Sequence, residues 1–210
     1  MLLTSFPIIS TEHLVLRNHK QDDKEDYFAL MSNPLAVRYF GRPVLTDMDQ
    51  VDDEFETIQL GFDNNNFIKW AITLKSDGRY IGSIGAWDLK NKHSRATLSC
   101  IVAPKYWGQK IGAEALTCVI RYLFETQKLH RLQIYVDPVN ERGVKFFRKI
   151  GFQSEGLLRD YEYEYGKYID IEILSFSKKL LTLFKSVFVP GTSWVFNCFI
   201  CSVFIPKIFL

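Results

Sequence analysis

The chain has 210 residues, of which 47% are apolar and 24% are charged, and its formal net charge is +2. A chain of this length holds one full hydrophobic core, because domains commonly run to roughly 100–200 residues, and this apolar fraction excludes bulk disorder. The near-neutral charge gives no support to an extended surface for nucleic acid or acidic lipid.

Hydrophobic periodicity predicts a mixture of strands and helices. In chain order, the pattern predicts a strand over 11–17, helices over 24–31 and 46–61, strands over 66–75, 79–87 and 96–102, a helix from 112, a strand over 131–136, a helix over 140–150 and a strand over 168–176. This order predicts an α/β, mixed α+β fold, with one mixed sheet and helices on both of its faces.

Local signals set some of the predicted boundaries. Thr46, with Asp49 three residues later, predicts a capping box at the start of the second helix. Gly78 makes a hairpin turn possible between the strands on either side, and Gly151 closes the helix that begins near Asn140.

The last part of the chain differs from the rest, because no charged residue occurs from Val187 to Pro206. About 20 apolar residues are enough for a helix to cross a bilayer, but Pro190 and Gly191 interrupt the run. A poorly ordered or abnormal extension and a membrane-contacting anchor both remain open for residues 180–210.

Four cysteines occur without the dense spacing of a disulfide scaffold, which indicates a reducing compartment and a cytoplasmic protein. Cys198 and Cys201 have the spacing of a zinc or redox pair, but no second Cys/His pair accompanies them, so we predict no metal site. The N-terminus lacks the positive region and the cleavage site of a signal peptide.

The most informative segment is Val102–Leu116, where a strand runs into a glycine-bearing loop that opens onto an amphipathic helix. The first amides of a helix have no partner within it, and the helix dipole adds about half a positive charge there. This junction predicts a site for a phosphorylated cofactor.

The same order of elements, with Tyr106–Leu116 at its centre, resembles the GNAT N-acetyltransferases, and among them the RimJ/RimL-like enzymes that acetylate the N-termini of ribosomal proteins. The resemblance rests on residues 12–17, 32–34, 81–85, 103–108, 137–140, 149–152 and 155–160. It implies a GNAT domain over residues 1–179, with a central sheet of about six or seven strands splayed at its centre, and an apolar extension over 180–210.

The resemblance implies acetyl-CoA as co-substrate, with its diphosphate in the loop and its pantetheine arm along the strand that ends at Val102. The implied coenzyme-binding residues are Val102, Trp107, Gly108, Gln109, Lys110, Ile111, Gly112, Ala113, Asn140 and Phe147. The family pattern of Gln or Arg, two residues, Gly, one residue, and Gly or Ala falls on Trp107, Lys110 and Gly112, so two of its three positions depart.

For catalysis, the resemblance points to Asn140 and to Glu162, which we interpret as a base near the substrate amine. The capping of a helix by Asn140 and a solvated carboxylate at Glu162 are the structural alternatives. Family members often carry a glutamate, a serine and a tyrosine where this chain has Thr97, Gly143 and Phe147.

The expected reaction is direct attack of a primary amine on the acetyl thioester. An α-amine with a pKa near 7.7–8.0 is about a tenth neutral at pH 7, whereas a lysine amine near 10.4 is neutral only about four times in ten thousand. A site with few catalytic groups therefore favours a protein N-terminus, such as that of a ribosomal protein.

Two alternatives stay open: a polyamine, amino-acid or aminoglycoside acetyltransferase, and a non-catalytic CoA-binding relative. P-loop and dinucleotide motifs are absent from the sequence, and nucleic-acid binding lacks both charge and motif.

Overall fold

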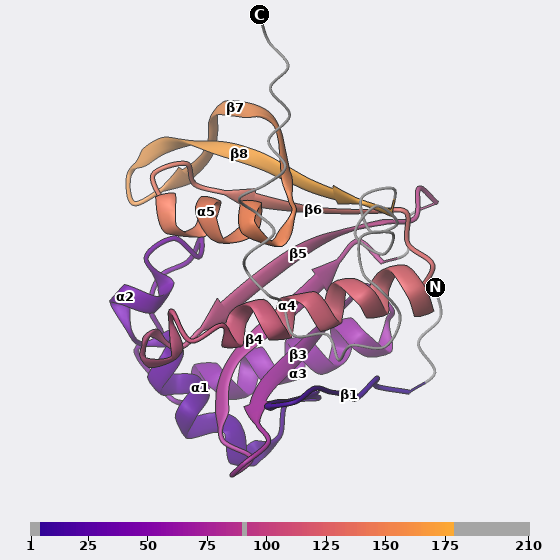
Figure 1. The fold of residues 1–210 in the computed structure, drawn as a ribbon. Helices are drawn as coiled ribbons and strands as arrows, with labels where there is room; N and C mark the ends of the chain where they lie inside the picture. Colours follow the sequence, from indigo (N-terminus) through magenta and orange to yellow (C-terminus); the bar gives the residue numbers. More distant parts are fainter. Residues whose placement is uncertain (1–4, 90–91, 179–210) are drawn as a thin grey trace, which may run out of the picture. The chain divides into compact units, whose positions relative to one another are not determined.

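The computed structural model describes residues 5–89 and 92–178. Within them the strands form one sheet of eight, in the order β1-β2-β3-β4-β5-β6-β8-β7 (Figure 1). The strands are β1 (Ile9–Ser10), β2 (Leu14–Arg17), β3 (Phe67–Leu74), β4 (Tyr80–Trp87), β5 (Arg95–Val102), β6 (Arg131–Val136), β7 (Gln153–Glu164) and β8 (Lys167–Ser177). The sheet is antiparallel except for the β5–β6 pair, which is parallel.

The mixed α/β architecture is confirmed, but the sheet has more strands than the expected six or seven. Two strands had no usable sequence signal. The two residues of β1 are too few to show a period. The residues of β7 are mostly exposed and polar or aromatic, so they lack the alternation that marks a half-buried strand.

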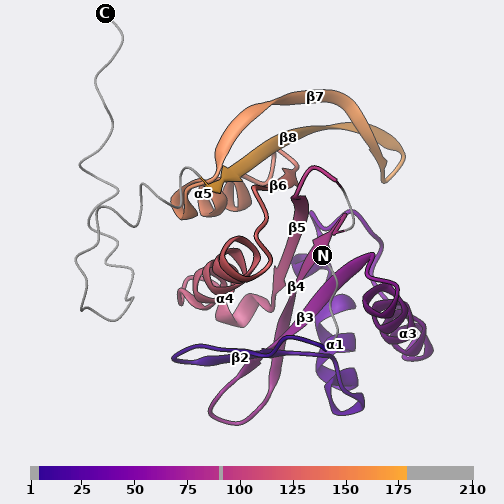
Figure 2. The ribbon, with the colours of Figure 1, turned by 90° about the vertical axis from the view of Figure 1, so that its right-hand side faces the viewer.

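Helices cover both faces of the sheet, as predicted. The longer helices are α1 (Lys24–Met31), α3 (Asp49–Asp63), α4 (Ile111–Arg121) and α5 (Glu141–Ile150), and α2 (Pro34–Val37) is a single turn. In Figure 2, α4 and α5 lie on one side of the sheet, and α1 and α3 lie on the other. The apolar stripe predicted after Gly112 is buried: Leu116, Val119 and Ile120 on α4, and Leu123 and Phe124 on the π-helical turn that follows (Tyr122–Thr126).

The capping box predicted from Thr46 and Asp49 is wrong. Helix α3 begins at Asp49 itself, so Thr46 lies outside its first turn. The Gln50 side chain reaches back instead, and its Oε1 accepts hydrogen bonds from the N–H groups of Thr46 (2.8 Å) and Asp47 (3.1 Å). The other two local signals are confirmed, since Gly78 has φ +74° in the β3–β4 turn and Gly151 ends α5 with φ +110°.

The predicted splay at the centre of the sheet is confirmed. Strand β4 pairs with β5 along its length, as far as Gly82 with Val102. Strand β6 pairs with β5 over three positions, of which Thr97 with Gln133 is the last. Beyond that pair the two strands part, and we call this region the split.

The predicted extension over residues 180–210 lies outside the described residues, and so do its apolar run over 187–206 and Cys198 and Cys201. Within the described part of the chain, no helix has the length and apolar character that a membrane crossing requires. In that same part, no three His, Cys, Asp or Glu side chains gather into a group able to hold a metal ion.

Candidate active site

The edge of β5 at the split carries main-chain groups that β4 does not use. In an antiparallel ladder, hydrogen-bonded pairs alternate with pairs whose N–H and C=O groups point the other way. The N–H of Ala103 donates to Ile81 O (2.8 Å), so its neighbour Val102 and, two residues earlier, Cys100 direct their main-chain groups away from β4 and toward the split. The C=O of Val102 accepts the indole N–H of Trp107 (2.7 Å), which leaves the Val102 N–H for a ligand.

The loop after β5 bends through two left-handed residues, Gly108 (φ +79°) and Lys110 (φ +64°). Glycine adopts this conformation freely, whereas a residue with a Cβ is strained there by roughly 1–2 kcal/mol. Gly108, Gln109 and Lys110 are exposed, and a Cβ placed on Gly108 would meet no atom within 4 Å. The loop therefore presents an open surface.

Helix α4 begins in this loop with free amides. The first helical hydrogen bond runs from Glu114 N–H to Lys110 O (2.9 Å), so the amides of Ile111, Gly112 and Ala113 precede it and have no partner within the helix. A Cβ on Gly112 would lie 3.5 Å from the Phe146 ring, so α5 packs closely against this turn. Unpaired amides, an open loop and an adjacent split fit a diphosphate with a long arm, as acetyl-CoA has.

Glu114 fixes the first turn of α4 to the N-terminal strands. Its carboxylate accepts hydrogen bonds from Thr11 Oγ1 (2.5 Å), His13 N–H (2.9 Å) and His13 Nδ1 (2.9 Å). Burial alone would raise the pKa of Glu114, but these hydrogen bonds bring it below its ordinary value. The helix start, and with it the loop, is thereby held at a fixed position beside β2.

Asn140 caps α5, which confirms the structural role considered for it. Its Oδ1 accepts the N–H of Gly143 (2.9 Å), while its own N–H donates to Asp137 O (2.9 Å). Its Nδ2 has no bond within the described residues, so a coenzyme contact from that atom stays a prediction. Phe147 is buried, with its ring centroid 5.1 Å from that of Phe146 and 5.9 Å from that of Phe152.

Neutral polar side chains line the sheet face that carries α1 and α3, next to the split. Thr97 and Gln133 form a register pair and so point to the same face, and Gln133 Nε2 donates to Thr97 Oγ1 (3.2 Å) and to Tyr135 Oη (3.2 Å). The Tyr135 ring stacks on Tyr161 of β7 at 6.1 Å. A hydrogen-bonded neutral row thus occupies this face, at the position of Thr97 where the resemblance implied a glutamate.

Glu162 lies on β7, half-buried and opposite Ile169 of β8. The structure adds a residue that sequence reasoning missed, because Glu164 lies two residues further on the same strand, near the Glu162 carboxyl. Burial raises the pKa of Glu164, and the neighbouring Glu162 and Asp137 carboxylates raise it further. The i, i+2 spacing could have revealed Glu164 if β7 had been recognised as a strand.

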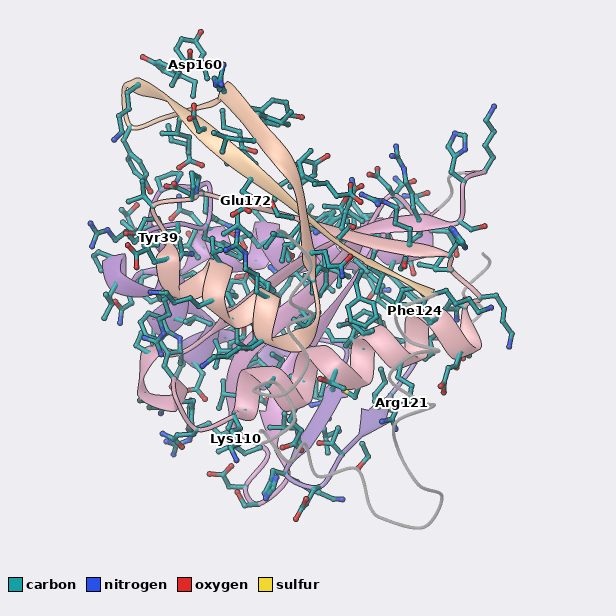
Figure 3. All side chains as sticks on the ribbon, turned by 45° about the horizontal axis from the view of Figure 1, so that its top comes forward. Tyr39, Lys110, Arg121, Phe124, Asp160 and Glu172 are labelled. Atoms are coloured by element: carbon teal, nitrogen blue, oxygen red, sulfur yellow. The ribbon has the colours of Figure 1, made fainter. Side chains whose placement is uncertain are left out.

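The β7–β8 turn contacts the loop between α2 and α3. The Tyr165 hydroxyl donates to Arg42 O (3.1 Å), and Glu164 Oε1 lies 3.1 Å from the position of a Cβ on Gly41. Figure 3 shows the β7–β8 hairpin extending beyond the helices, with Asp160 near its far end. The Glu164 carboxylate therefore lies where the β7–β8 turn meets a loop that is distant in the sequence.

A buried polar network anchors the loop between α2 and α3 through Arg42. Arg42 forms an ion pair with Glu54, Glu54 accepts a hydrogen bond from Tyr27, and Lys69 Nζ donates to Tyr27 Oη (2.9 Å). Burial lowers the pKa of Lys69 to about 8 and raises that of Tyr27. The network ties α1, α3 and β3 to the Gly41–Arg42 loop.

Comparison with known proteins places this architecture. The family model described as "Acetyltransferase (GNAT) domain" matches residues 13–153. The N-acetyltransferase YoaA of Bacillus subtilis, whose function is uncharacterized, is 32% identical over 173 residues, which span 82% of this chain and 98% of that protein.

The relatives include enzymes with two different kinds of named substrate. The spermidine N(1)-acetyltransferase of Escherichia coli is 24% identical over 159 residues, 76% of this chain and 83% of its own length. The [ribosomal protein uS5]-alanine N-acetyltransferase of Escherichia coli is 37% identical over 60 residues, 29% of this chain and 31% of its own length. Among solved structures, a Vibrio cholerae spermidine N-acetyltransferase in complex with CoA and spermine superposes with a TM-score of 0.71 at 19% identity, over 80% of this chain and 98% of that one.

Proposed function

Since this chain belongs to the GNAT acetyltransferase family and is an acetyl-CoA dependent N-acetyltransferase, we propose that its acceptor is a protein N-terminal α-amine, such as that of a ribosomal protein, which attacks the thioester directly. The observation that carries this proposal is the neutral row of Thr97, Gln133 and Tyr135 beside the split. This row supplies no carboxylate, so deprotonation of the acceptor depends on Glu162 of β7 alone. An α-amine needs the least of that help, because it is already about a tenth neutral at pH 7.

The coenzyme supplies the acetyl thioester, and the described residues hold it. The amides of residues 108–113 bind the diphosphate at the start of α4, and the main chain of Cys100 and Val102 holds the pantetheine arm. The Val102 N–H donates to the thioester carbonyl oxygen, where negative charge develops as the amine attacks.

Proton transfer falls to the carboxylates of β7. The amine nitrogen forms a bond to the carbonyl carbon, the carbon–sulfur bond breaks, the nitrogen loses a proton and the departing thiolate gains one. Glu162, paired with Glu164, accepts the proton from the amine. Phe147 has no hydroxyl to protonate the thiolate, so the thiolate takes its proton from water.

A polyamine is the second candidate acceptor. Glu162 and Asp137 lie near enough to Glu164 to raise its pKa, so this group of three acids would attract a polycation. A spermidine acetyltransferase is also among the relatives. The non-catalytic CoA-binding alternative is not proposed, because the family assignment makes the chain an N-acetyltransferase.

An acceptor panel separates these functions. The full chain is incubated with acetyl-CoA and each of four acceptors: a peptide with a free N-terminus and no lysine, an N-terminally blocked peptide with one lysine, spermidine, and an aminoglycoside. Released CoA and product mass are measured. We expect acetylation of the first peptide alone. A kcat/KM for spermidine at least tenfold above that for the peptide would establish the second function instead. CoA binding without acetylation of any of the four acceptors would refute both acceptor assignments.

Two matched variants test the base. Glu162→Gln should lower kcat by about two to four orders of magnitude and remove an ionisation from the pH profile. Asp160→Asn, a neutralisation on the same strand near the far end of the hairpin, should leave kcat unchanged. If the two variants behave alike, Glu162 is not the base.

A further inference from the structure

The cations around the coenzyme loop lack carboxylate partners. Several arginines elsewhere in the described chain are held by acids, for example Arg17 by Asp23 (2.7 Å) and Arg131 by Glu155 (2.5 Å). In contrast, the side chains of Lys110 at the start of α4 (Figure 3) and of Arg142 in the first turn of α5 form no ion pair or hydrogen bond within the described residues.

The Arg142 guanidinium is nevertheless fixed in place. Its Cζ lies 4.1 Å from the ring centroid of Trp107, so the guanidinium stacks on the indole. The indole is held in turn by its N–H bond to Val102 O (2.7 Å). The acid beside Arg142 is occupied elsewhere, because Glu141 pairs with Lys145 (2.9 Å).

A stacked guanidinium keeps the N–H groups at its edge free to bind an acceptor. Trp107, under the guanidinium, directly precedes Gly108, where a Cβ would meet no atom within 4 Å, and α5 packs against the first turn of α4 through Phe146 and Gly112. Planar, multiple N–H donors suit phosphate oxygens, and a fixed side chain loses little conformational freedom on binding.

We propose that Arg142, held on Trp107, binds a phosphate of the coenzyme and so determines the preference for CoA over phosphate-free thiols. This inference rests on the proposed coenzyme site and adds a specificity residue to it. The phosphate belongs either to the diphosphate or to the 3′-phosphate of the ribose. Trp107 acts through Arg142 and is a positioning residue.

Binding of CoA, 3′-dephospho-CoA and pantetheine to the full chain is measured by calorimetry, without an acceptor. Arg142→Ala should lower the affinity for CoA about 10-fold to 100-fold, as expected for loss of a charge-assisted hydrogen bond. The affinity for pantetheine should change less than twofold. Arg142→Lys should recover part of the loss. Trp107→Leu as a single substitution should lower the affinity for CoA, but in the Arg142→Ala background it should have little further effect on that affinity.

The control is Lys149→Ala, which removes one exposed positive charge from the last turn of the same helix and should change CoA affinity less than twofold. If Arg142→Ala lowers the affinity for 3′-dephospho-CoA as much as that for CoA, the contact is to the diphosphate. If the affinity for 3′-dephospho-CoA does not change, the contact is to the 3′-phosphate. The inference is overturned if Arg142→Ala changes the affinity for CoA no more than Lys149→Ala does, or if Arg142→Ala lowers the affinity for pantetheine as much as that for CoA.

These measurements also separate the inference from the proposed function. A wild-type chain that binds CoA but acetylates no acceptor refutes the function and leaves the Arg142 test valid. A wild-type chain that does not bind CoA refutes both.

Discussion

The Asn140 side chain can cap α5 only because residue 143 is a glycine, and this coupling between the two positions gives a quantitative prediction. A Cβ on Gly143 would lie 2.6 Å from Asn140 Nδ2 and 2.9 Å from its Cγ, closer than real Cβ contacts come. Gly143→Ala must therefore displace the Asn140 side chain from the cap that it makes on the Gly143 N–H.

Two effects of Gly143→Ala oppose each other. Replacing glycine by alanine within a helix stabilises it by roughly 0.5–1 kcal/mol, while losing an asparagine cap costs about 1 kcal/mol. The single variant should therefore be near neutral. In an Asn140→Ala background there is no cap to lose, so the same substitution should stabilise the protein by roughly 0.5–1 kcal/mol.

The assay is a double-mutant cycle of urea unfolding with wild type, both single variants and the double variant. We expect a coupling free energy of about 1 kcal/mol between the two positions, or a thermal shift of about 2–4 °C between backgrounds. Since Asn140 is also a predicted coenzyme contact, the affinity for CoA should fall in both single variants. Additive effects of the two substitutions would refute the reasoning, because the clash would then have no consequence.

Three further substitutions test other parts of the site. Lys110→Gly should leave stability within about 1 kcal/mol, because relief of left-handed strain offsets added chain entropy, and a thermal melt that falls by more than 5 °C would contradict this. The pKa of Lys69 is about 8 in the folded protein and 10.5 ordinarily, so between these pH values the unfolded chain binds more protons and wild-type stability rises with pH. Lys69→Met should remove about 2 kcal/mol of that rise between pH 7.5 and 9.5, measured by urea unfolding. Parallel stability curves for wild type and variant would exclude this contribution of Lys69. Glu114→Gln should lower the free energy of unfolding by about 1–2 kcal/mol at pH 7, with the difference lost as pH falls below the depressed folded pKa of Glu114, and an equal loss at pH 3 would show that ionisation is irrelevant.

Local chemistry was enough to predict much of the fold. The helix stripe at Leu116, Val119 and Ile120, the turn at Gly78 and the end of α5 at Gly151 each depend on residues close together in the chain, and each is confirmed. Hydrophobic periodicity predicted the order of the elements apart from β1, α2 and β7, and the β5–loop–α4 junction follows from one continuous stretch of sequence.

Local chemistry failed where a longer side chain or a weak pattern decided the outcome. Gln50, rather than Asp49, accepts the hydrogen bonds from main-chain amides before α3, because its longer side chain brings Oε1 within reach of the Thr46 N–H. Strand β7 is held mainly by its pairing with β8 rather than by burial of one face, so its sequence carries no period.

The sequence by itself determined which groups are available: free amides at a helix start, a glycine that allows the loop to bend, and few candidates for a base. The tertiary structure alone decided which of them meet. Glu164 approaches Gly41, Arg142 lies on Trp107, and the main chain at Val102 faces the split only because segments distant along the chain pack together. Sequence patterns report the energetics of neighbours along the chain, whereas these contacts depend on how the whole core closes.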